Sequence, residues 1–188
     1  MVKGSFGKNL EKIRIRFFER IQTNFFYISF LDFQNNLMES CGSDTRGLDE
    51  TVFQTPSLLH LTIGTLALMD EIERKKAKEI LESAIEEFKV AKKLNIEIKG
   101  LEIMNDDPGE VDVVYAKVND CDELQKLADG IVSKFAETGL MPRQFDRVKL
   151  HMTVLNTIFR KEDSDFQEEK TEQQQRETLD ARSLLKVA

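Results

Sequence analysis

Two short stretches of this chain share one pattern, and together they contain both of its histidines. Residues 58–64 and 149–155 each contain the order hydrophobic-His-hydrophobic-Thr-hydrophobic. Because side chains on a β-strand alternate between two faces, the histidine and the threonine of each stretch would share one face. Each stretch therefore predicts a strand that presents an imidazole and a hydroxyl on one side and packs into a core with the other. The residues concerned are His60, Thr62, His151 and Thr153.

The elements predicted around these strands repeat along the chain. A strand at 24–30, a helix and the histidine strand at 58–66 form one half, and a strand at 111–118, a helix and the histidine strand at 147–159 form the other. Two equivalent halves can pack about a pseudo-twofold axis. Such an axis would bring the histidine strands face to face across a groove. The alternative is that two ordinary buried strands each happen to hold a histidine.

Three further regions complete the domain organisation. Residues 1–22 are predicted to form an N-terminal segment with a basic helix, whose cations either face solvent or contact RNA. Residues 23–160 form the core, in which the Asn-Asp-Asp-Pro-Gly sequence at 105–109 predicts a turn rather than a calcium loop. Residues 161–188 hold a polar tract and a last helix that belong to the same domain.

Charge and composition narrow the classes of partner. The 188 residues have a net charge of −7, with a net charge of +4 confined to residues 1–20. Proteins that bind long duplexes by neutralising phosphates are usually basic overall, so nucleic acid would be met locally, in a cleft. No apolar run is long enough to span a membrane, and two cysteines without metal-ligand spacing indicate a reduced compartment.

The paired histidines and threonines predict acid–base chemistry on a phosphodiester. The pKa of a free imidazole is about 6.5, so near neutral pH one histidine can take a proton while the other gives one. Threonine hydroxyls can hold the nonbridging oxygens and stabilise developing charge. We expect no metal and no cofactor, because two histidines alone make a poor zinc site.

Two residues are candidates for substrate binding. Lys149 lies two positions before His151, so a strand places both side chains on one face. It either contacts the phosphate next to the scissile one or points to solvent at the start of the strand. Tyr115, in the strand at 111–118, is the second candidate.

The chain resembles the two-histidine (2H) phosphoesterase superfamily. Within it, the chain is similar to the branch that contains the phosphoesterase domain of activating signal cointegrator 1 complex subunits and the related central domain of nuclear A-kinase anchoring proteins. The residues that carry the resemblance are 58–64, 104–109, 111–118 and 148–161, and it extends from about residue 24 to residue 186. The chain departs from the pattern at Asn24, where the family has histidine, and it contains no KH domain.

The resemblance implies a fold, an activity and a setting. It implies a bilobal α+β fold with two antiparallel sheets that form a central cleft. It implies metal-independent cleavage of RNA or of 2′,3′-cyclic phosphate ends, with His60 and His151 as the acid/base pair and Thr62 and Thr153 as phosphate ligands. It also implies a subunit of a nuclear coactivator and alkylation-repair complex with a helicase partner, located in the nucleus with the cytoplasm as a second site, and monomeric outside the complex.

Two classes of function therefore stay open. The first is the phosphodiesterase, which the intact histidine and threonine pairs favour. The second is a nucleotide- or RNA-binding interaction module of the same complex, which keeps the pocket without useful turnover. Incubation with short RNAs and a 2′,3′-cyclic nucleotide in the presence of EDTA separates the two.

Overall fold

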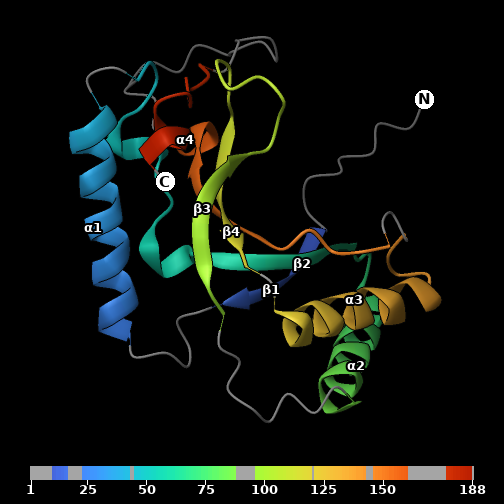
Figure 1. The fold of residues 1–188 in the computed structure, drawn as a ribbon. Helices are drawn as coiled ribbons and strands as arrows, with labels where there is room; N and C mark the ends of the chain where they lie inside the picture. Colours follow the sequence, from blue (N-terminus) through green and yellow to red (C-terminus); the bar gives the residue numbers. More distant parts are fainter. Residues whose placement is uncertain are drawn as a thin grey trace, which may run out of the picture. The chain divides into compact units, whose positions relative to one another are not determined.

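A computed structural model gives the structure of the chain. It describes residues 10–16, 23–42, 45–87, 96–119, 121–142, 146–160 and 177–187, and for residues 10–16 and 23–27 it describes the backbone only. The predicted polar tract at 162–178 therefore lies almost wholly outside the described residues. Strands and helices both contribute, so the α+β class is confirmed (Figure 1).

The strands are β1 (Leu10–Arg16), β2 (His60–Ala67), β3 (Ile98–Ile103), β4 (Val113–Val118) and β5 (His151–Asn156). They are hydrogen-bonded in the order β1-β2-β5-β4-β3. The described strands thus form one five-stranded sheet, where the resemblance implied two sheets. The pseudo-symmetric halves and the central cleft stay predictions.

The chain divides into two compact units that do not follow the repeat in the sequence. The first unit takes its described residues from Met1–Ile15, Leu61–Glu97 and Val118–His151. The second unit takes them from Arg16–His60, Ile98–Lys117 and Met152–Ala188. Each unit thus collects segments from both predicted halves, and the borders of the units fall at the two histidines.

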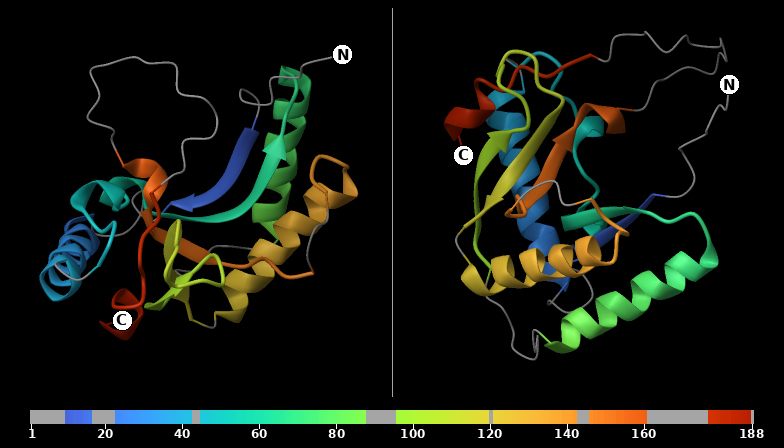
Figure 2. Two further views of the ribbon diagram at one scale, coloured as in Figure 1. Left: turned by 90° about the horizontal axis from the view of Figure 1, so that it is seen from above. Right: turned by 90° about the vertical axis from the view of Figure 1, so that its right-hand side faces the viewer.

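The first unit is built around β2 and two helices, α2 (Glu71–Glu87) and α3 (Asp122–Glu137) (Figures 1 and 2). Asp70 caps α2, because its Oδ1 accepts a hydrogen bond from the backbone N–H of Glu73 at 2.8 Å. The two helices pack against each other. Buried side chains of all three elements form one core, whose members include Ile63, Leu66, Ala77, Ala84, Leu127, Ile131 and Phe135.

The second unit contains a helix where the sequence predicted a strand at 24–30. Helix α1 runs over Thr23–Cys41 and replaces both the predicted strand and the short helix after it. Phe30, Leu37 and Cys41 are buried, at spacings of seven and four residues that place them on one helical face. The aromatic and β-branched residues in this stretch suggested a strand, but burial at the helical period decides the structure.

The predicted basic helix at the N-terminus is also wrong, because β1 occupies Leu10–Arg16. The sequence Lys-Ile-Arg-Ile-Arg at 12–16 alternates with a period of two and contains β-branched Ile13 and Ile15. Leu10, Ile13 and the later apolar residues also fit a helical spacing, so the stretch was ambiguous. Hydrogen bonding to β2 decides in favour of the strand.

The predicted turn at 105–109 is confirmed and is closed by side chains of the second unit. Asn105 Nδ2 donates to the carbonyl of Glu110 at 2.8 Å, and the N–H of Gly109 donates to Asp107 Oδ1 at 2.8 Å. The chain then enters an antiparallel bridge between Val111 and Leu179, close to the last helix α4 (Leu184–Val187). These residues of the family pattern therefore have a structural role.

Arg160, also within the family pattern, ties together segments of the second unit that are distant in sequence. Its guanidinium donates to the carbonyl of Gly47 at 2.6 Å, to the carbonyl of Glu177 at 2.9 Å and to Asp49 Oδ2 at 3.3 Å. Burial raises the pKa of Asp49, but hydrogen bonds from Thr51 and the charge of Arg160 outweigh it and hold that pKa below its usual value.

Candidate active site

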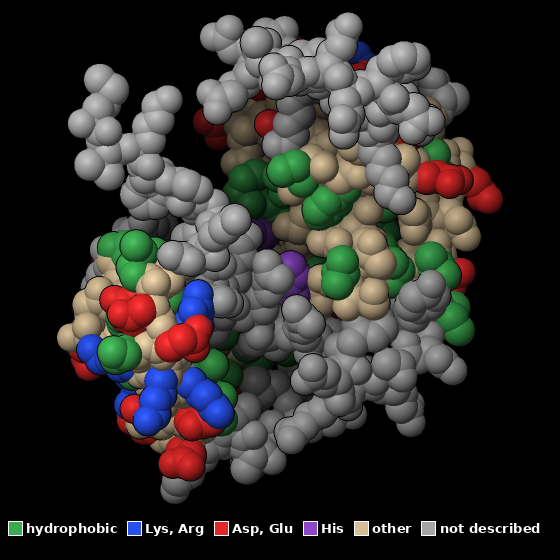
Figure 3. Space-filling view, turned by 180° about the vertical axis from the view of Figure 1, so that it is seen from behind, with side chains coloured by type: hydrophobic (Ala, Val, Ile, Leu, Met, Phe, Trp, Pro, Cys, Tyr) green, Lys and Arg blue, Asp and Glu red, His purple; other side chains and the backbone are tan. Residues whose placement is uncertain are grey.

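The alternation predicted for the two histidine strands is present. In β2, Leu61 and Ile63 are buried while His60 and Thr62 are half-buried. The second strand repeats this pattern: in β5, Met152 and Val154 are buried while His151 and Thr153 are half-buried. Histidine side chains are visible at the molecular surface in Figure 3. Each strand therefore anchors in a core with one face and presents its imidazole and hydroxyl on the other.

Both imidazoles are held by the same local hydrogen bond. The Nδ1 atom of His60 lies 2.7 Å from the carbonyl oxygen of Leu58, and that of His151 lies 2.8 Å from the carbonyl oxygen of Lys149. A carbonyl only accepts, so Nδ1 carries the proton in each ring. The neutral form of each ring is then the Nδ1–H tautomer, and Nε2 is the nitrogen that gains or loses a proton.

A cavity of about 320 Å³ in the first unit brings the two motifs together. Thr62 of the first motif and His151 of the second both line it, and we call it the Thr62–His151 cavity. The polar and charged side chains on its wall are Thr62, Thr65, Arg147, Lys149 and His151. An imidazole, hydroxyls and two cations around a space of this size are suited to a phosphate group. His60 and Thr153 belong to the second unit.

Gly64 shapes the wall of this cavity. A Cβ atom built on it would lie 2.5 Å from Cε of Met141, whose side chain occupies the space beside the glycine. A larger residue at this position would displace the Met141 thioether, and both residues line the cavity. Glycine therefore fits the close approach of the β2 backbone to Met141.

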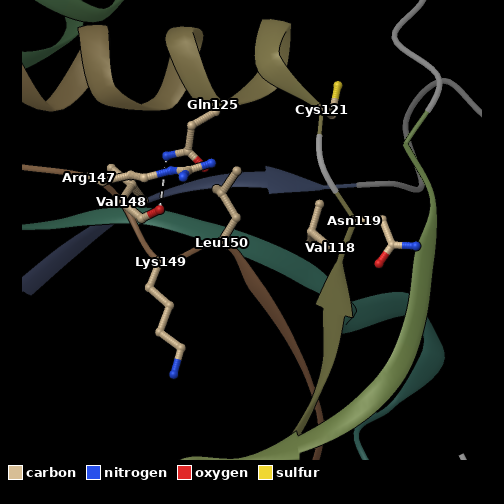
Figure 4. A pocket seen from close by; sticks show the side chains of 8 residues that line it. All are labelled: Val118, Asn119, Cys121, Gln125, Arg147, Val148, Lys149 and Leu150. Carbon is tan, nitrogen blue, oxygen red and sulfur yellow. Dashed lines mark hydrogen bonds between the residues drawn. The ribbon is translucent and has the colours of Figure 1, made fainter.

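Lys149 lines the cavity and precedes the first residue of β5. Its side chain is exposed. In Figure 4 it extends away from α3, whereas the Arg147 side chain lies beside Gln125. Arg147 is a second cation at this site that the sequence analysis missed; its spacing of four residues from His151 was the available signal.

Two polar side chains of α3 hold the segment that leads to His151. Asp129 Oδ1 accepts from the backbone N–H of Val148 at 2.7 Å. Gln125 Nε2 donates to the carbonyl of Val148 at 3.0 Å (Figure 4). Gln125 Nε2 also donates to Asp129 Oδ1 at 2.9 Å. Residues 146–150 lie outside the regular strand and lack its ladder of hydrogen bonds, so the bonds from α3 hold them next to the cavity. Sequence reasoning had no signal for this contact, which is made only in the folded chain.

Removal of the Asp129 carboxylate is expected to destabilise the first unit. In Asp129→Ala the N–H of Val148 loses its acceptor, so the free energy of unfolding should fall by about 1–3 kcal/mol. Asp129→Asn keeps an oxygen acceptor and should restore most of the loss, whereas Glu137→Ala, on the same helix, serves as the matched control. Urea denaturation of the three variants measures this, and equal stability of Asp129→Ala and wild type would contradict the assignment.

Tyr115 does not behave as a substrate-binding residue in this structure. Only 2 % of its surface is exposed, and its hydroxyl donates to Glu102 Oε2 at 2.7 Å. Glu102 also pairs with Lys117 through a contact of 3.5 Å between Nζ and Oε1. Its neighbours Val114 and Ala116 are buried as well, so β4 is covered on both faces at this point. Its role in the structure is therefore packing within the second unit.

The described part of the chain offers neither a metal site nor a membrane-spanning helix. Among the residues that the structure describes, no group of three or more His, Cys, Asp and Glu side chains is placed to hold a metal ion. No helix within the described ranges is long and apolar enough to cross a membrane. The expectation of chemistry without a metal rests on the histidine and threonine pairs and stays a prediction.

Comparison with known proteins gives a family, a relative and a structural neighbour. Residues 20–187 match the model of the AKAP7 2′5′ RNA ligase-like domain family. The chain is 45% identical over 140 residues to activating signal cointegrator 1 complex subunit 1 of Mus musculus, a match that covers 71% of this chain. The chain spans 39% of the length of that relative.

A solved structure, TT0787 of Thermus thermophilus, aligns with a TM-score of 0.46 and 18% sequence identity. The alignment covers 69% of this chain and 67% of that one.

Proposed function

This chain belongs to the AKAP7 2′5′ RNA ligase-like domain family, and from that membership and the site geometry we propose that it is a metal-independent phosphodiesterase acting on RNA or on 2′,3′-cyclic phosphate ends. The relation to the two-histidine phosphoesterases read from the sequence is thereby confirmed. The observation that most supports the activity is the Thr62–His151 cavity, in which one member of each motif lies beside two cations.

The proposed reaction is an in-line displacement at phosphorus. One imidazole takes a proton from water through Nε2, the water oxygen forms a bond to phosphorus, and the bond from phosphorus to the leaving ribose oxygen breaks. The other imidazole, charged beforehand, gives its Nε2 proton to that oxygen. His60 and His151 fill these two roles. In each ring Nδ1 is bonded to a backbone carbonyl, which leaves Nε2 for the proton transfer. Thr62 and Thr153 donate to the nonbridging oxygens.

A second candidate is a nucleotide- or RNA-binding module without useful turnover. Arg147 and Lys149 favour it, because two cations beside a cavity can hold a phosphate whether or not a bond is cleaved. A binding module would retain affinity for a nucleotide while releasing no product, so measurements of affinity and product formation on the same sample separate the two functions.

We also propose a setting from the relative's name and the family resemblance. The relative is a subunit of the activating signal cointegrator 1 complex, so the chain is proposed to act as a subunit of such a nuclear complex beside a helicase, and to be a monomer outside it. Affinity purification from nuclear and cytoplasmic fractions, followed by mass spectrometry, tests this. Recovery without any complex subunit in either fraction would contradict the proposal.

Chelation of metal ions is expected to leave the activity unchanged. The proposed chemistry needs only imidazole and hydroxyl groups, so the rate of 2′,3′-cyclic nucleotide opening should be the same with and without EDTA. The measurement is product formation after dialysis against EDTA. Loss of activity that returns on addition of a divalent ion would contradict the mechanism.

Lys149→Ala is expected to act differently on two substrates. Its ammonium group can pair with the phosphate next to the scissile one, which a short RNA has and a cyclic mononucleotide lacks. The variant should raise KM for short RNA by roughly tenfold and weaken its salt dependence, while opening of the cyclic mononucleotide barely changes. Lys126→Ala, an exposed lysine on α3, is the matched control. Equal losses on both substrates, or none, would reject this role.

A further inference from the structure

A second cavity of the first unit lies next to the Thr62–His151 cavity. Its volume is about 310 Å³, within the range of about 300–1,000 Å³ typical of small-molecule sites. We call it the Cys121 cavity (Figure 4), and its wall contains Val118, Asn119, Cys121, Gln125 and Leu150. None of these five residues lines the Thr62–His151 cavity, so the two can be changed separately.

The two cavities share one stretch of wall. Arg147, Val148 and Lys149 line both of them. The two outer members of this stretch are cations with exposed side chains, in a chain whose net charge is −7. A ligand that fills both cavities would therefore pass two positive side chains at the junction, and a phosphodiester linkage places its negative charge at that point.

The remaining wall of the Cys121 cavity combines apolar and amide groups. Val118 and Leu150 offer apolar surface against which a base can lie. Asn119 Nδ2 donates to Glu97 Oε2 at 2.8 Å, which orients the amide, and in Figure 4 its oxygen lies on the side of Val118. An amide oxygen accepts hydrogen bonds from the exocyclic amine of a base or from a ribose hydroxyl. These are groups of a nucleoside.

We propose that the Cys121 cavity binds the nucleoside next to the reacting nucleotide, with Arg147 and Lys149 holding the phosphate that joins the two. The inference rests on the proposed function and names its substrate class: an RNA of at least two nucleotides. Arginine can bind a phosphate through two parallel N–H bonds, and lysine acts as a point charge. A mononucleotide fills only the Thr62–His151 cavity, so it lacks both the joining phosphate and the contacts of its neighbouring nucleoside with the Cys121 cavity.

Two ligands that do not react test this by isothermal titration calorimetry: a mononucleotide 3′-phosphate and the diribonucleotide that ends in the same 3′-phosphate. Wild type should bind the diribonucleotide at least about tenfold tighter, the effect of one charge-assisted hydrogen bond. Cys121→Phe fills the second cavity and should abolish the preference while leaving affinity for the mononucleotide unchanged. Cys121 makes no side-chain cap to α3, so the substitution removes no such bond.

Glu137→Phe, which places the same ring at the other end of α3, should keep the preference. If Cys121→Phe does not fold, Asn119→Leu decides, since it removes the amide from the same wall and should reduce the preference. Equal affinity of wild type for both ligands would overturn the proposal, and so would a wild-type preference in folded Cys121→Phe or, if that variant does not fold, in Asn119→Leu. Opening of a 2′,3′-cyclic nucleotide by the same proteins reports on the phosphodiesterase separately, because the affinities need no turnover.

Discussion

His151→Ala is expected to lower kcat for the opening of a 2′,3′-cyclic nucleotide by about 10²–10⁴-fold, and His60→Ala by a similar factor. Each variant removes a group that is proposed to take or give a proton in the displacement. Product formation followed by chromatography measures the loss. The variants delete a half-buried side chain, so circular dichroism must show that each one is folded before its rate is interpreted.

The His60→Ala/His151→Ala double variant shows whether the two histidines act on one transition state or in separate steps. If both histidines act on one transition state, the double variant should be little slower than the slower single variant, because the losses are not additive. The two single variants also assign the imidazole proton resonances completely, since the sequence holds two histidines. Near-wild-type turnover in either folded single variant would show that the two-histidine assignment is wrong.

Thr62→Val is expected to lower kcat by about 10²–10³-fold, as found for the loss of one donor to a developing negative charge. Valine keeps the shape and the branching of threonine but has no hydroxyl, so β2 should keep its alternation. Because the donor acts on charge that develops in the transition state, KM should change much less than kcat. Steady-state kinetics with a 2′,3′-cyclic nucleotide measures both constants.

Thr65 supplies the matched control for this prediction. It lies on β2 and lines the same cavity, but it stands outside the His-Thr pattern. Thr65→Val should therefore lower kcat far less than Thr62→Val does. Thr153→Val, the counterpart in the second motif, should lower kcat about as much as Thr62→Val. Similar rates for the Thr62 and Thr65 variants would contradict the assignment of Thr62 to the phosphate.

The sequence predicted the histidine strands because three local signals agreed there. Alternation of apolar and polar residues, β-branched side chains and the repeated motif all favoured strands, and the structure has β2 and β5 in place. Helices α2 and α3 also have local signals in the sequence, since Asp70 caps the first and both carry buried apolar residues at the helical spacing. Gly139, with φ of +74°, follows the second of these helices, and glycine readily adopts this left-handed conformation.

The N-terminal elements were mispredicted where the signals conflicted. Residues 24–30 are rich in aromatic residues, which favours a strand, but Phe30, Leu37 and Cys41 are buried at the helical period on α1. Residues 10–16 fit both periods, and pairing with β2 chose the strand. In both cases tertiary packing overrode a local preference, which a single sequence does not reveal.

The candidate site was predicted only as far as strand geometry reaches. Lys149 was expected on the same strand face as His151 because the two residues are two positions apart. Asp129 and Gln125 hold the Val148 backbone from positions 22 and 26 residues before His151. No sequence motif marks them, so their contact with this segment could not be predicted. The sequence also did not show that Tyr115 is buried, because Val114, Tyr115 and Ala116 are covered on both faces of β4 by packing that a single strand does not reveal.

One assay tests the metal-independent two-histidine mechanism most directly. Wild type and the His60→Ala/His151→Ala double variant are each incubated with a 2′,3′-cyclic nucleotide in the presence of EDTA. We expect wild type to convert the cyclic phosphate to a single monophosphate product and the double variant to give no more product than buffer. If wild type binds the nucleotide but releases no product above the buffer rate, the chain is a binding module and the phosphodiesterase account is wrong.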